Sequence, residues 1–140
     1  MAEPSATPPA RKIAAPIGNP ESKPFWDAAR EGRFMIGRCA GEGGCGKAHF
    51  YPRSVCPLCF TPGALLEQAS GEGTIYTLSV TYRGVPEPLA IGYVELAEGP
   101  RMLTNFTGAP LESFKIGDRV KLVWTPTEDG APPVAMFGPA

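Results

Sequence analysis

Four cysteines constrain this chain more than any other feature of its sequence. Cys39, Cys45, Cys56 and Cys59 are the only cysteines present, and their spacing is C-x5-C-x10-C-x2-C. Two pairs of thiolates on two tight turns can converge on one tetrahedral cation, and four cysteines are a common ligand set in structural zinc sites. We therefore predict one structural Zn²⁺ site held by these four residues, with no catalytic role for any of them.

The two halves of this motif differ in their spacing. Two residues separate Cys56 from Cys59, which is typical of a zinc knuckle, whereas five residues separate Cys39 from Cys45. Three glycines within the longer loop provide the backbone freedom that closing it requires: Gly41, Gly43 and Gly44. Gly46, directly after Cys45, fits a turn that directs backbone amides toward the sulfur. The first turn is therefore the part of the predicted site that departs from common geometry.

Other interpretations of the cysteines stay open at this stage. Iron bound as in rubredoxin uses the same four-sulfur geometry as zinc. A redox Cys-x-x-Cys usually opens a helix in a thioredoxin-like fold, a pattern that the surroundings of Pro57 do not show. His49, the only histidine, lies between the two pairs and would be able to replace Cys39 or Cys45 as a ligand. Because four thiols already fill the coordination sphere, we interpret His49 as a surface residue.

The composition limits the classes of protein to which the chain can belong. Its 140 residues suffice for one compact domain and a small appendage, and 17 Gly with 17 Pro favour turns and strands over long helices. A net charge of −1 provides no positive field for phosphate backbones, so nucleic acid is a disfavoured partner. The first residues contain no long apolar run and no signal-peptide cleavage site. This predicts a cytoplasmic protein without a membrane anchor, in a compartment where thiols stay reduced and bind metal.

The sequence pattern divides the chain into three parts. Residues 1–21 are rich in proline and poor in large apolar side chains, so we predict a flexible arm, with ordering along a partner as the alternative. Residues 22–64 hold a short helix and the cysteine motif. From residue 65 onward β-branched and aromatic residues alternate with polar ones, which predicts a β domain over 65–140.

The predicted helix lies between Ser22, which can cap its N-terminus, and Gly32, which can end it. Phe25 and Trp26 share its apolar face. A helix this short cannot bury an indole by itself. These two aromatic residues therefore either dock on their own domain or form a contact with a partner subunit, where aromatic side chains are enriched.

Five strands are predicted in the C-terminal part, over residues 74–82, 89–96, 101–106, 119–124 and 133–137. Five short strands with little helix suit an OB-fold barrel. The predicted fold is therefore mainly β: an N-terminal short helix and a rubredoxin-like zinc ribbon, followed by a five-stranded OB-fold barrel. Single-stranded nucleic-acid binding is an alternative function of such a barrel, but its basic residues are few and scattered. We accordingly interpret the barrel's large aromatic residues as core or edge packing: Tyr76, Tyr82, Tyr93 and Trp124.

The order of several motifs resembles that of a known family. The motifs are PFWDAAREGRF at 24–34, YPR at 51–53 ahead of CPLC at 56–59, SGEGTIY at 70–76, GPRMLTN at 99–105 and IGDRV at 116–120. Together, over roughly residues 22–138, they resemble the bacterial and archaeal zinc-ribbon/OB-fold proteins that are associated with acyl-CoA enzymes. The longer first cysteine loop is the departure from that pattern.

The resemblance implies a function that depends on a partner. It implies an accessory subunit in a hetero-oligomer with a thiolase-fold catalytic subunit, or alternatively with a hotdog-fold enoyl-CoA hydratase. Such a subunit supports assembly and helps to shape the acyl-CoA site, for which Arg83 or Arg101 is a candidate phosphate contact. The residues themselves agree, because assigning every cysteine to metal leaves no thiol nucleophile beside the single histidine. No catalytic residue is predicted.

Overall fold

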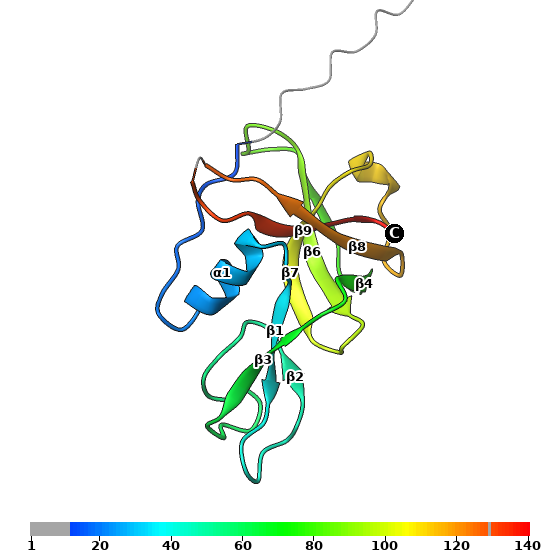
Figure 1. Cartoon of the computed structure of the whole chain (residues 1–140). Coiled ribbons are helices and arrows are strands. Elements are labelled where there is room, and N and C mark those ends of the chain that lie inside the picture. Colours follow the sequence, from blue (N-terminus) through cyan, green and yellow to red (C-terminus); the bar gives the residue numbers. More distant parts are fainter. Residues whose placement is uncertain (1–11, 129) are drawn as a thin grey trace, which may run out of the picture.

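The computed structural model describes residues 12–128 and 130–140. The chain is mainly β, as predicted, with one short α-helix, a three-stranded ribbon sheet and a barrel sheet (Figure 1). The ribbon extends from one end of the barrel, and the helix lies beside both (Figure 1). Of the predicted flexible arm, residues 1–11 lie outside the described residues, and residues 12–19 have no regular secondary structure. No helix in the described part of the chain is long and apolar enough to span a membrane.

Helix α1 covers Lys23–Arg30, with Glu31 as its C-cap residue. The predicted terminating residue, Gly32, follows directly and has a φ of +77°. A left-handed residue just after a helix is usually glycine, because glycine has no Cβ to clash there. The N-terminus differs in detail from the prediction. Ser22 occupies the capping position but makes no side-chain cap bond. Its backbone N–H instead donates to the Asn19 side chain at 2.8 Å, within a turn that precedes the helix.

The ribbon is a three-stranded antiparallel sheet with β1 in the middle. Strand β1 (Met35–Cys39) pairs with β2 (Ala48–His49) on one side and with β3 (Ala64–Gln68) on the other. Strand β1 leads to Cys39, and the two long connections, 40–47 and 50–63, contain the other three cysteines. The sheet therefore fixes the ends of both cysteine-bearing loops.

The barrel is formed by β4 (Glu72–Ile75), β5 (Ser79–Thr81), β6 (Leu89–Leu96), β7 (Arg101–Phe106), β8 (Arg119–Thr125) and β9 (Val134–Pro139), with a 3₁₀ turn at Leu111–Ser113. The strand order is β4-β8-β9-β7-β6-β5, and an additional pairing of β4 with β6 closes the sheet. Strands β4 and β5 are two parts of one interrupted segment, so the barrel has the five-stranded organisation that was predicted.

The interruption between β4 and β5 was not predicted, since residues 74–82 were expected to form one continuous strand. Both Tyr76 and Thr77 donate their N–H groups to the Tyr93 carbonyl, at 2.8 and 3.2 Å. Two residues opposite one define a bulge, which bends a strand. A Cβ at Gly92 would lie 2.0 Å from the Thr77 carbonyl oxygen, so this bend requires a glycine on the neighbouring strand.

One hydrophobic core joins the helix, the ribbon and the barrel. Phe25 is only 2% exposed, and its ring lies 4.9 Å from that of Trp26, 5.7 Å from Phe50 and 6.3 Å from Phe34. Phe34 in turn meets Phe137 of the barrel at 6.4 Å. The aromatic chain therefore runs from α1 through the start of the ribbon into the barrel.

The interpretation of the barrel tyrosines as packed residues is wrong. Tyr76, Tyr82 and Tyr93 are 46%, 55% and 44% exposed. The alternation along β6 explains Tyr93, because its neighbour Val94 points into the core and the tyrosine must point outward. Only Trp124 is partly buried against the core, as expected.

Candidate metal centre

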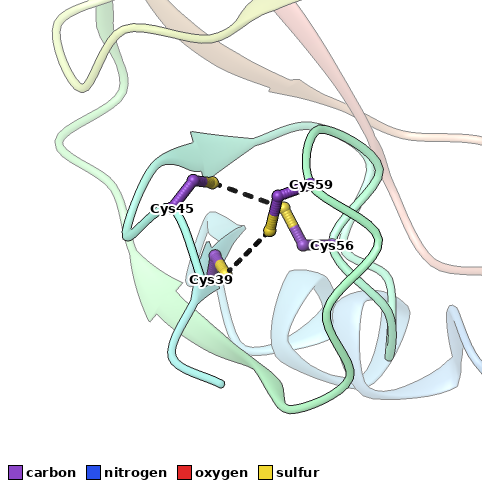
Figure 2. A group of neighbouring side chains, drawn as sticks. All are labelled: Cys39, Cys45, Cys56 and Cys59. Carbon is purple, nitrogen blue, oxygen red and sulfur yellow. Dashed lines mark hydrogen bonds between the residues drawn. The ribbon is translucent and has the colours of Figure 1, made fainter. Parts of the chain in front are cut away.

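The four cysteine sulfurs lie together at the tip of the ribbon. All four lie within 4.8 Å of one another, and Figure 2 shows the side chains gathered around a common centre. The sulfurs of Cys39 and Cys59 are 3.7 Å apart, as are those of Cys45 and Cys56. A tetrahedral zinc ion with bonds of about 2.3 Å would separate its sulfur ligands by roughly 3.8 Å. The arrangement therefore fits one four-coordinate ion held by thiolates.

The first cysteine turn accommodates its extra length through glycines that approach other groups closely. A Cβ at Gly44 would lie 2.5 Å from the Cys39 sulfur, and a Cβ at Gly41 would lie 2.1 Å from the Pro62 carbonyl oxygen. The Gly44 N–H also donates to the Gly41 carbonyl at 3.0 Å, which folds the loop back on itself. The five-residue loop is thus compatible with the cluster because glycine leaves room for the sulfur.

The second cysteine turn is held by bonds to its sulfurs and across its ends. The Leu58 N–H donates to the Cys56 sulfur at 3.4 Å. The Cys56 N–H donates to the Thr61 carbonyl at 3.0 Å, and the Phe60 N–H donates to the Cys56 carbonyl at 2.8 Å. The Thr61 side-chain oxygen lies 3.3 Å from the Cys59 sulfur. Thr61 was not singled out in the sequence, although its place two residues after Cys59 is the signal that would have indicated it.

These bonds make the thiols unequal as acids. The Thr61 hydroxyl and backbone amides lower the pKa of Cys59 to about 6. The Gly46 amide lowers the pKa of Cys39. The Lys47 amide acts in the same direction on Cys45, but burial and the neighbouring thiols outweigh it and raise the pKa of Cys45 to about 11. Cys39 and Cys59 are therefore already biased toward the thiolate form that metal binding requires.

His49 is neither a ligand nor a surface residue, so its interpretation as a surface residue is wrong. It is 3% exposed and does not belong to the sulfur cluster. Its Nδ1 lies 3.0 Å from the Tyr51 carbonyl oxygen, and its ring lies against Gly37, where a Cβ would come within 2.0 Å of it. The imidazole is buried because the glycine on β1 leaves space for it.

The other predicted contact residues lie apart from the sulfur cluster. Phe25 belongs to the core, so of the proposed pair only Trp26 keeps substantial exposed surface. The guanidinium of Arg101 lies 3.7 Å from the centre of the Tyr76 ring and 3.0 Å from the Glu95 carboxylate. Arg83 is exposed in the turn after β5. The two arginines therefore stay candidates for a phosphate contact, with Arg101 already engaged by its neighbours.

Comparison with known families matches both parts of the fold. Residues 26–63 match the model of the ChsH2 rubredoxin-like zinc ribbon domain, and residues 66–125 match that of the ChsH2 C-terminal OB-fold domain. The solved structure described as "Ltp2-ChsH2(DUF35) aldolase" superimposes with a TM-score of 0.73 at 29% identity. The alignment covers 89% of this chain and 98% of that one. This chain therefore shares both its fold and its cysteine-bearing ribbon with the ChsH2 domains.

Curated relatives show the same similarity in sequence. A "DUF35 domain-containing scaffold protein" of Methanothermobacter thermautotrophicus is 34% identical over 101 residues, covering 67% of this chain and 76% of the relative. "Benzoylsuccinyl-CoA thiolase subunit BbsA" of Thauera aromatica is 31% identical over 121 residues, covering 76% and 81%. The "Probable enoyl-CoA hydratase alpha subunit" of Thermomonospora curvata is 32% identical over 105 residues, but the match spans 71% of this chain and only 32% of that larger protein. The chain belongs to the DUF35 family and joins a ChsH2-type rubredoxin-like zinc ribbon to a ChsH2-type OB-fold domain.

Proposed function

We propose that the chain is a non-catalytic accessory subunit of a thiolase-type acyl-CoA enzyme complex. The observation that carries the proposal is the gathering of all four cysteine sulfurs within 4.8 Å of one another. Since the chain has no other cysteine, this cluster uses its whole supply of thiol nucleophiles. The name of the Thauera relative, a thiolase subunit, and the word "scaffold" in the Methanothermobacter name support an accessory role for this chain beside a separate catalytic subunit.

In this proposal the metal is Zn²⁺ with a structural role. Cys39, Cys45, Cys56 and Cys59 would hold it, and four thiolates leave no open position for water or substrate. The ion would supply folding energy to a ribbon whose strands are short, β2 having two residues. Iron held by four thiolates absorbs visible light and zinc does not, so the absorption spectrum of the purified chain together with its metal content distinguishes the two.

The ribbon, helix α1 and the proline-rich arm would then form the side of the molecule that docks on the catalytic subunit, while the barrel completes the subunit's own core. This assignment follows the predicted division into an arm over 1–21, a helix and ribbon over 22–64 and a barrel over 65–140, except that the ribbon sheet extends through β3 to Gln68. The half-buried Trp26 is the helix residue that remains available for such a contact. Arg83 or Arg101 would meet a phosphate of the acyl-CoA at the edge of the shared site.

A second candidate partner is an enoyl-CoA hydratase. The observation that favours it is the similarity to the Thermomonospora hydratase subunit, of which this chain matches about a third. With a hydratase as its partner, this chain would keep its accessory role, and the complex would catalyse hydration instead of a thiolase reaction.

Nucleic-acid binding is the remaining candidate, and the exposed tyrosines of the barrel favour it. Against it, the guanidinium of Arg101 already covers the Tyr76 ring and pairs with Glu95. A gel shift with single-stranded oligonucleotides that weakens with added salt would support this alternative.

Affinity purification from the cells that make this protein tests the proposal. A tagged full-length chain is isolated, and the proteins that elute with it are identified by mass spectrometry. We expect a thiolase-fold acyl-CoA enzyme in stoichiometric amount. A hydratase in its place would favour the second candidate, and elution of the chain without any acyl-CoA enzyme would contradict the accessory role.

A further inference from the structure

Phe60 has a backbone conformation that is unusual for its residue type. It has a φ of +64°, and every other described residue with a positive φ is a glycine. The left-handed region is unfavourable for a residue with a Cβ, and more so for a bulky one. In the first cysteine turn the residue in the same left-handed conformation is a glycine: Gly46, directly after Cys45, has a φ of +70°. Phe60, the residue after Cys59, stands at the equivalent place in the second turn.

Backbone hydrogen bonds hold this turn, but within the described part of the chain no aromatic contact of the Phe60 side chain offsets the strain. The Phe60 side chain is 77% exposed. Each of the other six phenylalanines has its ring centre within 6.4 Å of another aromatic ring, and Phe60 is absent from these pairs. Its N–H bond to the Cys56 carbonyl would be available to any residue at this position. A strained backbone that carries an exposed side chain points to a role outside the chain itself.

The surroundings of Phe60 indicate the chemistry of what it meets. Residues 51–66 contain only one lysine, arginine, aspartate or glutamate, which is Arg53. The same segment exposes several more large apolar side chains, among them Val55, Leu58 and Leu65. Phosphate backbones and anionic lipid surfaces require clustered cations, which this segment lacks. A segment that exposes an aromatic side chain and several aliphatic ones, with few charged side chains along it, fits an apolar pocket on another protein.

We infer that Phe60 is an anchor by which the ribbon inserts into an apolar pocket on the catalytic acyl-CoA subunit. This inference rests on the proposed function and adds the residue that makes the contact. A single phenylalanine buries roughly 200 Å², well below the ~800 Å² per partner that a stable interface buries. Phe60 is thus one strong contact within a larger interface, and the metal cluster holds it in place because Cys59 directly precedes it.

The substitution Phe60→Gly distinguishes between two roles of Phe60. Loss of an anchor lowers the affinity for the partner, whereas loss of a structural residue lowers the stability of the chain. Glycine relieves the strained φ, so the urea midpoint of the metal-loaded chain should stay the same or rise. The Kd for the purified partner, measured by calorimetry, should increase by about tenfold or more. Ile116→Ala is the matched control: it removes another exposed apolar side chain, on the barrel, and should leave both measurements unchanged.

The partner in this experiment is the acyl-CoA enzyme that co-purifies with the unsubstituted chain. If no such enzyme co-purifies, the proposed function itself fails. If it does and Phe60→Gly binds as tightly as the original chain, the anchor is refuted while the proposed function stands. A Phe60→Gly chain that loses as much stability as affinity would show a purely structural role. A photoreactive phenylalanine analogue at position 60 that cross-links only to a second copy of the chain would also overturn the inference.

Discussion

Gly44 shows how one residue makes an atypical metal loop possible. The sequence predicted that glycines would close the five-residue gap between Cys39 and Cys45, but it did not indicate which glycine was critical. The structure places the Gly44 Cα against the Cys39 sulfur, where a side chain would lie 2.5 Å away. The spacing of cysteines is local information, whereas the contact between a glycine and a sulfur depends on how the loop folds back.

We therefore expect Gly44→Ala to weaken metal binding by about tenfold, because the Cys39 sulfur must move away from its position in the cluster. Competition with a chromophoric chelator measures the affinity. Glu42→Ala, an exposed substitution in the same loop, serves as the control and should bind metal normally. Equal affinities for the two variants would show that the loop adjusts freely around the sulfur.

The hydrogen bond between Tyr82 and Glu112 offers a prediction about pH. The Tyr82 hydroxyl donates to the Glu112 carboxylate at 2.8 Å. The backbone N–H of Glu112 and this hydroxyl lower the pKa of Glu112, and the bond raises the pKa of Tyr82. A carboxyl group whose pKa is lower in the folded state stabilises the fold at any pH above the pKa that it has in the unfolded chain. This stability is lost as the pH falls through the pKa of the folded state. The bond therefore stabilises the fold at neutral pH and ceases to do so in acid.

Tyr82→Phe should raise the pKa of Glu112 toward its ordinary value, while leaving it somewhat lowered by the remaining backbone bond. An NMR titration of the Glu112 carboxyl carbon measures this change. Tyr93→Phe, on the exposed face of β6, is the control and should not change it. An unchanged Glu112 titration in Tyr82→Phe would mean that the bond is not formed in solution.

At the scale of elements, strands whose bounds are set by local sequence patterns were predicted well. A feature that depends on a contact between distant residues was not. Strands β6 and β7 have the predicted bounds, because alternating side chains and a Gly-Pro turn define them within the sequence itself. The break between β4 and β5 escaped prediction because Tyr76 and Thr77 are good strand formers. What bends the chain there is the close approach to Gly92, which is far away in the sequence.

Gly92→Ala should for that reason destabilise the barrel by about 2 kcal/mol or more, since its Cβ would collide with the Thr77 carbonyl oxygen and overpack the bulge. Urea unfolding gives the change in the free energy of unfolding. Leu103→Thr, on the exposed face of β7, should stay within about 0.5 kcal/mol of the original chain. A fully stable Gly92→Ala variant would contradict the bulge as described.

For the whole molecule, the shared aromatic core connects the ribbon that contains the metal site to helix α1 and the barrel. The sequence left open whether Phe25 docks on its own chain or on a partner, because burial of a helix face depends on the tertiary fold. Phe25 proves to be buried within its own chain, where it packs against Phe34 and Phe50, and Phe34 in turn meets Phe137 of the barrel. His49 was misjudged for the same reason, since the space beside Gly37 exists only once β1 and β2 are paired.

Removal of the metal by a strong chelator should consequently disorder the ribbon first. The barrel has buried residues of its own, such as Ile75, Val94 and Val120, and should keep its strands. We expect amide NMR signals from residues 35–68 to lose dispersion while those from 89–106 are retained, with a lower melting temperature for the whole chain. A ribbon with unchanged signals in the absence of metal would rule out a structural role for the ion.

Acyl-CoA turnover by three samples tests the central claim most directly: the purified chain, its co-purifying catalytic subunit, and the two combined. The account predicts no turnover by the chain alone, impaired turnover or poor solubility for the catalytic subunit alone, and full activity for the mixture. Turnover by the chain alone, or full activity of the catalytic subunit without it, would contradict the assignment of this protein as a non-catalytic accessory subunit.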